Sequence, residues 1–327
     1  MRRADRIDVQ HHILPPDYVR LVGREAIARL VVSGRMPEWT PQASIDAMDR
    51  NGVELAVTSL SAPGFAFDDE AMAARIARHC NEYAADLRRS HPGRFGMFAT
   101  LPLPHVAACM DEIDYSLDVL GADGVCLLSN YENRYLGDAL FDPVLEELAR
   151  RKAVVFVHPA DVAGSRPLEH IPAATLEFPF DTTRAIVNML FSGALTRSRG
   201  ARFVFSHAGG ALPYLADRIA RLQRRPDFNR HIPDGVIFEL ERLYFDTALS
   251  ASHRIFGALR QIAAPDRILF ASDYPFAAED TMTATVDGLG RLGLAEEELQ
   301  AIERTNALAL MPHLLGGAAA KRTATQR

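Results

Sequence analysis

The stretch RIDVQHHILPPDYV, residues 6–19, joins a short β-branched run to a cluster of polar side chains. The run Ile7–Val9 predicts a β-strand, Gln10, His11 and His12 follow it, and two prolines end it. Eight apolar runs of this kind end in polar, Gly or Pro residues, at 6–11, 54–61, 95–103, 124–129, 153–159, 202–210, 243–248 and 267–275.

Between these runs lie amphipathic segments such as 68–91 and 142–152, with apolar residues at i, i+3 and i+4. Strands that alternate with helices form a parallel sheet, and eight such units close a barrel. We therefore expect an α/β protein, a single (β/α)8 TIM barrel over residues 1–315. Loop insertions follow the first strand, at 17–50, and the fifth, at 160–182, and residues 316–327 form a low-complexity tail that is expected to be disordered.

Composition excludes several classes of protein. The chain has 327 residues, of which 48% are hydrophobic, so it can bury a large core. Its net charge of −6 argues against a nucleic-acid or anionic-membrane partner. The N-terminal residues lack the apolar run of a signal peptide, so none is expected. No run approaches the roughly 18 apolar residues of a membrane span. The 3 cysteines have no CxxC spacing, and we expect buried thiols in a cytoplasmic protein.

Side chains suited to bind a metal gather at the ends of the predicted strands. Gln10 and His12 end the first strand, His158 the fifth, His207 the sixth and Asp273 the eighth. Side chains at i and i+2 share one face of a strand, so Gln10 and His12 point together into the barrel mouth while His11 points outward. Each residue alone also fits a structural role in a loop or cap. Together, on one rim, they predict a site for one divalent ion, Zn or Mn.

The same blocks resemble the amidohydrolase superfamily, specifically its aminocarboxymuconate-semialdehyde-decarboxylase-like branch. The resemblance implies His12, His158 and Asp273 as metal ligands and His207 as a catalytic histidine. A His-x-His motif follows the first strand in this family, and Gln10 stands where the first histidine would be. The blocks span most of the chain: IDVQHHILPP (7–16), GVCLLSNYENRYLGD (124–138), VVFVHPAD (154–161), FDTTRAI (180–186), FSHAGGALPYLADR (205–218), LYFDTA (243–248) and ILFASDYPF (268–276).

Gln10 leaves three readings open, because an amide oxygen is a neutral and weaker ligand than Glu or His. It is a metal ligand, or it lies beside an ion held by the other residues, or no metal binds. The resemblance implies a metal-dependent, non-oxidative decarboxylase of a small aromatic or muconate-like carboxylic acid, in which Asp273 or His207 donates the proton. A hydrolase of C–O, C–N or C–C bonds in a small cyclic or aromatic substrate, and a non-catalytic barrel, are the alternatives. No organic cofactor is expected, and the resemblance implies a homodimer.

A carboxylate substrate calls for cationic and aromatic partners. Arg134, after the fourth strand, and Arg184, expected at the start of a helix, are candidates for the carboxylate, although each also fits a surface ion pair. Trp39 and Phe180, with Phe178, are candidates for stacking on a ring, although each also fits simple packing. Asp246, at the end of the seventh strand, and Asp8 are candidates to orient neighbouring site residues.

Overall fold

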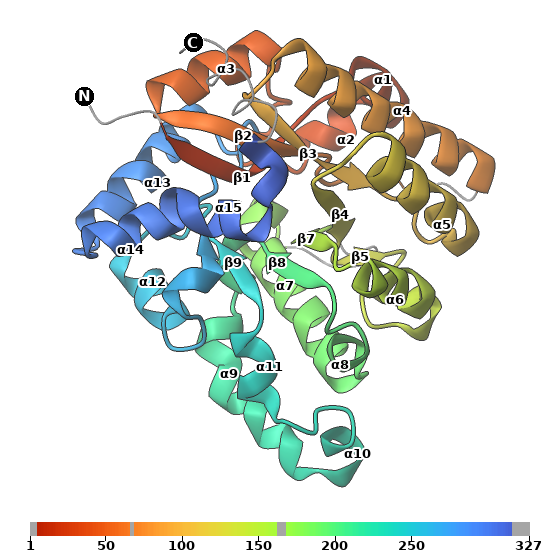
Figure 1. Cartoon of the computed structure of the whole chain (residues 1–327), viewed down its shortest axis with the longest axis vertical. Helices are drawn as coiled ribbons and strands as arrows, with labels where there is room; N and C mark the ends of the chain where they lie inside the picture. Colours follow the sequence, from red (N-terminus) through yellow and green to blue (C-terminus); the bar gives the residue numbers. More distant parts are fainter. Residues whose placement is uncertain (1–4, 66–68, 162–167, 316–327) are drawn as a thin grey trace, which may run out of the picture.

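A computed structural model describes residues 5–65, 69–161 and 168–315, so the predicted tail at 316–327 lies outside the described residues. In this part of the chain an eight-stranded sheet runs in the order β1-β2-β3-β4-β7-β8-β9-β10, and neighbouring strands in this order pair in parallel. Figure 1 shows the strands at the centre with helices around them. The predicted (β/α)8 barrel is confirmed. Its strands are β1 (Arg6–His12), β2 (Val53–Ser59), β3 (Phe95–Thr100), β4 (Gly124–Leu128), β7 (Val154–His158), β8 (Arg202–Phe205), β9 (Tyr244–Asp246) and β10 (Ile268–Leu269).

The barrel closes between β1 and the segment that follows β10. Val9 N donates to Phe270 O at 3.0 Å, Asp273 N donates to Gln10 O at 2.9 Å, and His12 N donates to Tyr274 O at 2.7 Å. These bonds place the first barrel strand beside the segment that follows the last one, as parallel closure of the barrel requires. Gln10 and His12 are therefore neighbours of Asp273, although His12 and Asp273 are 261 positions apart.

The helices follow the predicted alternation. The expected helix at 68–91 is α4, whose N-cap Asp69 accepts from Ala71 N and Met72 N, and that at 142–152 is α6. In the described residues no helix combines the length and apolarity needed to cross a membrane. The helices are α1 (Pro16–Val22), α2 (Arg24–Ala28), α3 (Pro41–Arg50), α4 (Glu70–Ser90), α5 (Val106–Asp114), α6 (Asp142–Arg150), α7 (Ala173–Phe191), α8 (Ala194–Arg197), α9 (Leu212–Ala220), α10 (Pro226–Asn229), α11 (Val236–Glu241), α12 (His253–Leu259), α13 (Glu279–Arg291), α14 (Glu296–Gln300) and α15 (Asn306–Leu310).

Two local expectations need correction. The segment 17–50 carries α1, α2 and α3, and α7 begins at Ala173 within the segment 160–182, so Arg184 lies in the middle of a helix and not at its start. Helix α7 continues through Pro179 because its buried face packs on the core, with Ile186 and Met189 fully buried.

The sequence analysis did not predict a short hairpin that follows β4. Strands β5 (Asn130–Tyr131) and β6 (Arg134–Tyr135) pair in antiparallel fashion across Glu132 and Asn133, both of which have positive φ. Two consecutive residues of this conformation are typical of a two-residue hairpin loop.

Apolar side chains fill the barrel interior. Phe98 and Phe156 stack with ring centroids 5.6 Å apart, and Val9, Leu55 and Val204 are fully or almost fully buried beside them. This packed core makes the barrel a rigid support for the rim at the carboxyl ends of its strands. The three cysteines are buried and free, and burial raises the pKa of the Cys80 and Cys126 thiols to about 12.

Candidate active site

Three predicted metal ligands meet at the carboxyl ends of the strands. His12 ends β1, His158 ends β7, and Asp273 follows β10. One donor atom from each lies within 4.8 Å of the other two. His12 Nε2 is 2.9 Å from Asp273 Oδ1, and His158 Nε2 is 3.8 Å from the same oxygen. The closed barrel thus brings together two imidazoles and a carboxylate, a donor set that suits a divalent transition metal or zinc.

Neighbouring groups hold both imidazoles in place. His158 Nδ1 lies 2.8 Å from the backbone oxygen of Pro159, which only accepts, so Nδ1 carries the proton and Nε2 presents its lone pair toward Asp273. His12 Nδ1 lies 2.9 Å from Ser59 Oγ on β2. Such partners fix the ring orientation of metal-binding histidines.

The protonation states also fit a cation. Burial lowers the pKa of His158 to about 4, so this imidazole is neutral at physiological pH. Burial raises the pKa of Asp273, but its hydrogen bonds with His12 and His207 outweigh it and hold the pKa well below its usual range. The site therefore offers a neutral imidazole and an ionised carboxylate, the forms in which both groups bind metals.

Gln10 lies on the same face as His12, as the strand parity predicted. Its Nε2 is 2.7 Å from Asp273 Oδ1, 3.1 Å from His207 Nε2 and 3.4 Å from His12 Nε2. Its Oε1 is buried and has no hydrogen-bond partner among the described residues. Because the two amide orientations exchange oxygen and nitrogen, one of them turns a neutral oxygen donor toward the cluster. The residues present therefore fit a metal ion, and Gln10 as a ligand stays a prediction.

His11 points away from the site, as expected. Its Nδ1 lies 3.0 Å from Asp8 Oδ2, its Nε2 lies 3.0 Å from Ser44 Oγ, and its ring stacks on Tyr274. Asp8 also accepts from Ser272 N, so it ties β1 to the segment that carries Asp273. Asp8 therefore supports the site through the backbone on both sides of the barrel closure.

His207 follows β8 and faces Asp273 from the other side. Its Nε2 is 3.4 Å from Asp273 Oδ2, while Asp273 Oδ1 faces His12 and His158. Burial lowers the pKa of His207, but the hydrogen bond and charge of Asp273 and the charge of Asp246 outweigh it, so the pKa is raised. An imidazole beside a cavity, with its pKa raised in this way, suits proton transfer to a bound molecule.

Asp246 holds the backbone of His207. Its Oδ1 accepts from His207 N at 2.8 Å and from Ala248 N at 3.1 Å, and burial raises its pKa to about 7. His207 itself has φ +53°, and Gly210 comes so close to α7 that a Cβ there would lie 2.0 Å from Pro179 O. The turn therefore fits only with a glycine at position 210, which explains the second Gly of the SHAGG sequence.

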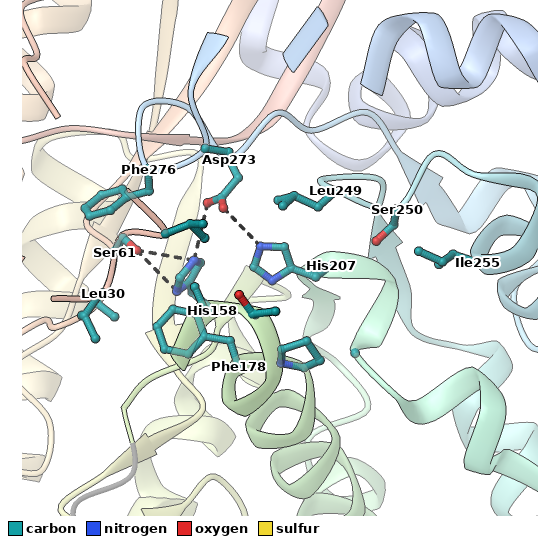
Figure 2. Close-up of a pocket in the computed structure, with 17 residues that line it drawn as sticks. Leu30, Ser61, His158, Phe178, His207, Leu249, Ser250, Ile255, Asp273 and Phe276 are labelled. Atoms are coloured by element: carbon teal, nitrogen blue, oxygen red, sulfur yellow. Dashed lines mark hydrogen bonds and ion pairs between the residues drawn. The ribbon is translucent and has the colours of Figure 1, made fainter. Parts of the chain in front are cut away.

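A cavity of about 460 Å³ opens above these groups (Figure 2). The metal-site end supplies most of its polar lining, and the rest of the wall is largely apolar. Its lining residues are Leu30, Val32, Ser61, Ala62, His158, Ala174, Thr175, Phe178, Pro179, His207, Gly210, Leu249, Ser250, Ile255, Asp273, Phe276 and Ala277. A mostly apolar cavity with a few convergent polar groups is typical of a small-molecule site.

The cavity lining contains one of the aromatic candidates, Phe178, but not Phe180. The two side chains are two positions apart on α7, about 200° around the helix, so Phe178 is buried at the cavity while Phe180 is 43% exposed. Arg184 lies with Phe180 on a separate groove of α7 and α9.

Arg134 and Trp39 also lie outside the cavity lining. Arg134 is exposed and pairs with Asp138, and Trp39 Nε1 donates to Ser44 Oγ. The structure does not bring Arg134, Arg184, Trp39 or Phe180 to the cavity, so their role as substrate contacts stays a prediction without support from this chain's geometry.

Sequence reasoning missed most of the cavity wall. Ser61, Leu249 and Phe276 each follow the end of a barrel strand, and Leu30 lies in the turn after α2. The rule that residues after strand ends face the active-site side of a barrel could have indicated the first three. Leu30 carried no such signal, because only the path of the inserted segment places it there.

Comparisons with known proteins show which family this chain resembles. A family model described as Amidohydrolase matches residues 7–312. The 6-methylsalicylic acid decarboxylase of Penicillium expansum is 36% identical over 95% of this chain and 97% of that protein. The decarboxylase yanB of Aspergillus niger is 35% identical over 94% of this chain and 88% of that protein.

Solved structures give the same picture of the fold. The crystal structure of an amidohydrolase II has a TM-score of 0.87 at 29% identity and covers 94% of this chain and 99% of that one. A dihydroxybenzoic acid decarboxylase from a Polaromonas species, with bound manganese and the inhibitor 2-nitroresorcinol, has a TM-score of 0.78 at 21% identity over 94% of this chain and 97% of that one.

Proposed function

This chain belongs to the amidohydrolase family, and from that membership we propose that it is a metal-dependent, non-oxidative decarboxylase of a small aromatic carboxylic acid. Four relatives that are 32–36% identical over 94–95% of this chain are named decarboxylases. The observation that carries the proposal is the cluster of His12, His158 and Asp273 beside His207 at one end of an apolar cavity.

The metal would be held by His12, His158 and Asp273, with Gln10 as a further oxygen donor. We propose zinc or manganese, since nitrogen and carboxylate donors suit both ions and manganese is bound in the Polaromonas decarboxylase. When bound, such an ion supplies a Lewis acid and a template for the substrate carboxylate and an adjacent oxygen.

His207 is the proposed proton donor, since its pKa is raised while that of Asp273 is held well below its usual range. The imidazolium transfers its Nε2 proton to the ring carbon that bears the carboxylate. The bond from that carbon to the carboxylate then breaks, its electron pair restores the aromatic ring, and CO2 leaves. The Asp246 carboxylate keeps His207 in position by accepting a hydrogen bond from the His207 backbone N. The apolar wall excludes water from the reacting carbon.

Gln10→Glu is expected to tighten metal binding by at least tenfold. The carboxylate adds a negative charge at a position whose amide nitrogen is 2.7 Å from Asp273 Oδ1, and an anionic oxygen is a stronger ligand than an amide oxygen. Titration of the metal-free protein with Zn²⁺ or Mn²⁺ against a competing chelator measures the change. Gln42→Glu, on the exposed side of α3 where Gln42 bonds Asp46, is the matched control. Equal affinity in wild type and Gln10→Glu would remove Gln10 from the ligand set.

The function itself is tested with protein purified without chelators or a histidine tag. We expect close to one equivalent of divalent metal per chain, and release of CO2 with the matching phenol from hydroxybenzoates in a chromatographic assay. If the metal-loaded protein releases no CO2 from any hydroxybenzoate but opens lactones, the protein is a hydrolase and not a decarboxylase. Protein that binds no metal and turns over neither class would support the non-catalytic barrel.

The homodimer and the cytoplasmic location stay predictions. Light scattering coupled to size-exclusion chromatography measures the mass in solution and decides the first.

A further inference from the structure

A β-bulge interrupts β1 just before the candidate metal ligands. Asp8 pairs with Ala56 of β2. His11, three positions later, pairs with Thr58, which is only two positions beyond Ala56. Over this stretch β1 therefore holds one residue more than its neighbour, and an extra residue of this kind re-aims the side chains that follow it.

The bulge decides which side chains of β1 face the metal site. Before it, Ile7 and Val9 pack in the barrel interior. After it, Gln10 and His12 point toward Asp273. Side chains alternate along a regular strand, so without the bulge Val9 inside would place Gln10 and His12 outside. The contribution of β1 to the metal site therefore depends on this one irregularity.

The Asp8 carboxylate fastens the bulge to the segment that closes the barrel. Its Oδ1 accepts from Gln10 N at 3.1 Å and from Ser272 N at 3.0 Å, and its Oδ2 accepts from Ser272 Oγ at 2.5 Å. Ser272 directly precedes Asp273 in the sequence. Asp8 is fully buried, so its carboxylate depends on donors from the protein in place of water.

His11 supplies a further donor to this carboxylate. Its Nδ1 lies 3.0 Å from Asp8 Oδ2, and a carboxylate accepts, so Nδ1 carries the proton. Its Nε2 lies 3.0 Å from Ser44 Oγ on α3, which accepts from Trp39 Nε1 at 2.8 Å. An indole nitrogen only donates, so the Ser44 hydroxyl proton is left for His11 Nε2. These contacts set both the tautomer and the orientation of the ring.

Packing alone does not account for an imidazole at this position. The ring is fully buried and stacks on Tyr274 with centroids 5.1 Å apart, a place that an apolar side chain could also fill. Burial of a polar ring costs free energy unless its nitrogens are hydrogen-bonded. What the imidazole adds is therefore the hydrogen bond to Asp8 across the bulge.

We propose that His11 is a positioning residue for the metal site. Through Asp8 it holds the β1 bulge in the register that turns Gln10 and His12 toward Asp273. Through Ser44 it fixes this register to α3 of the inserted segment. His11 thus acts on the ligands although its own side chain points away from them.

Hydrogen–deuterium exchange of the metal-free protein tests the register directly. The amides to follow are those of His12 and Asp273, because they make the bonds that close the barrel, to Tyr274 O at 2.7 Å and to Gln10 O at 2.9 Å. Their exchange rates need neither metal nor substrate, so this measurement does not depend on the proposed function.

Two substitutions at one position separate hydrogen bonding from packing. His11→Leu fills the space but leaves Asp8 without one donor, so we expect both amides to exchange about tenfold faster. His11→Asn retains an N–H near the position of Nδ1 and should exchange at close to the wild-type rate. A role in packing alone predicts the opposite order, because asparagine leaves a void where leucine does not.

Metal affinity gives a second measurement, and this part rests on the proposed function. His11→Leu should bind Zn²⁺ or Mn²⁺ about 10- to 100-fold more weakly than the wild type in competition with a chelator, the range expected when a partner of a metal ligand is lost. His11→Asn should bind close to the wild-type affinity.

Asn81→Leu is the matched control. Asn81 Nδ2 donates to Glu112 Oε1 at 2.8 Å between α4 and α5, and both residues are buried, so this change also removes a donor from a buried carboxylate. It should lower the midpoint of thermal unfolding but leave metal affinity and the two amides as in the wild type. If it speeds their exchange as much as His11→Leu does, the effect is global and the inference fails.

Ser44→Ala decides the question if His11→Leu does not fold. It frees the His11 ring without removing it, so both amides should exchange several-fold faster. Wild-type exchange in this variant, or equal exchange in His11→Leu and His11→Asn, would overturn the inference.

The two measurements also separate this inference from the proposed function. If the wild type binds no metal but the expected order of exchange rates is found, His11 holds the register and the metal-dependent decarboxylase fails. If the wild type binds metal and releases CO2 while His11→Leu matches it in exchange and affinity, the decarboxylase stands and the role of His11 fails.

Discussion

His207→Asn is expected to lower kcat by 10²- to 10⁴-fold while the metal content stays at the wild-type level. Asparagine retains a side-chain amide near the position of the imidazole but cannot donate a proton to carbon. The ligand set of His12, His158 and Asp273 does not include residue 207, so the ion should remain. Steady-state rates of CO2 release, paired with elemental analysis of the same sample, measure both quantities.

The control for this variant is His170→Asn, the same chemical change at a side chain that is 87% exposed. It should leave kcat and metal content as in the wild type. If His207→Asn kept wild-type kcat, His207 would lose its role as proton donor, and Asp273 would become the candidate. If it lost the metal as well, His207 would be a ligand and not the acid.

His158→Ala is expected to lower metal affinity by more than 100-fold and to abolish turnover. One nitrogen of its ring is among the donor atoms that lie within 4.8 Å of one another, and even outer partners of metal ligands contribute 10- to 100-fold to affinity. Metal bound only to the native state stabilises it by roughly 2.7 kcal/mol at 100 times Kd. We therefore expect added Zn²⁺ or Mn²⁺ to raise the unfolding midpoint of the wild type and not that of His158→Ala.

This measurement does not depend on activity, so it also separates metal loss from misfolding. The metal-free forms of the wild type and of His158→Ala should both unfold cooperatively, and only the response to metal should differ. A variant that binds one equivalent of metal and turns over at the wild-type rate would end the assignment of this metal site.

Much of the fold and of the site followed from local patterns. Strands such as 153–159 end in polar residues and alternate with helices, and parallel strands that close a barrel must present their carboxyl ends on one rim. Parity along the first strand put Gln10 and His12 on one face and His11 on the other, and the structure confirms this orientation. These features depend on periodicity within a few residues, which the order of amino acids alone determines.

The cavity wall depended on tertiary structure. Leu30, Leu249 and Phe276 come from segments that no local period relates to one another, and only the closed barrel and the paths of its loops bring them to one cavity. Likewise, Arg184 and Phe180 lie on a separate groove, because the packing of α7 on the core sets the rotation of this helix about its axis. The sequence by itself determined the barrel and the residues on its rim, because strand and helix periods act locally. The tertiary structure decided which side chains meet the substrate, because contacts between distant segments set loop paths and helix rotation.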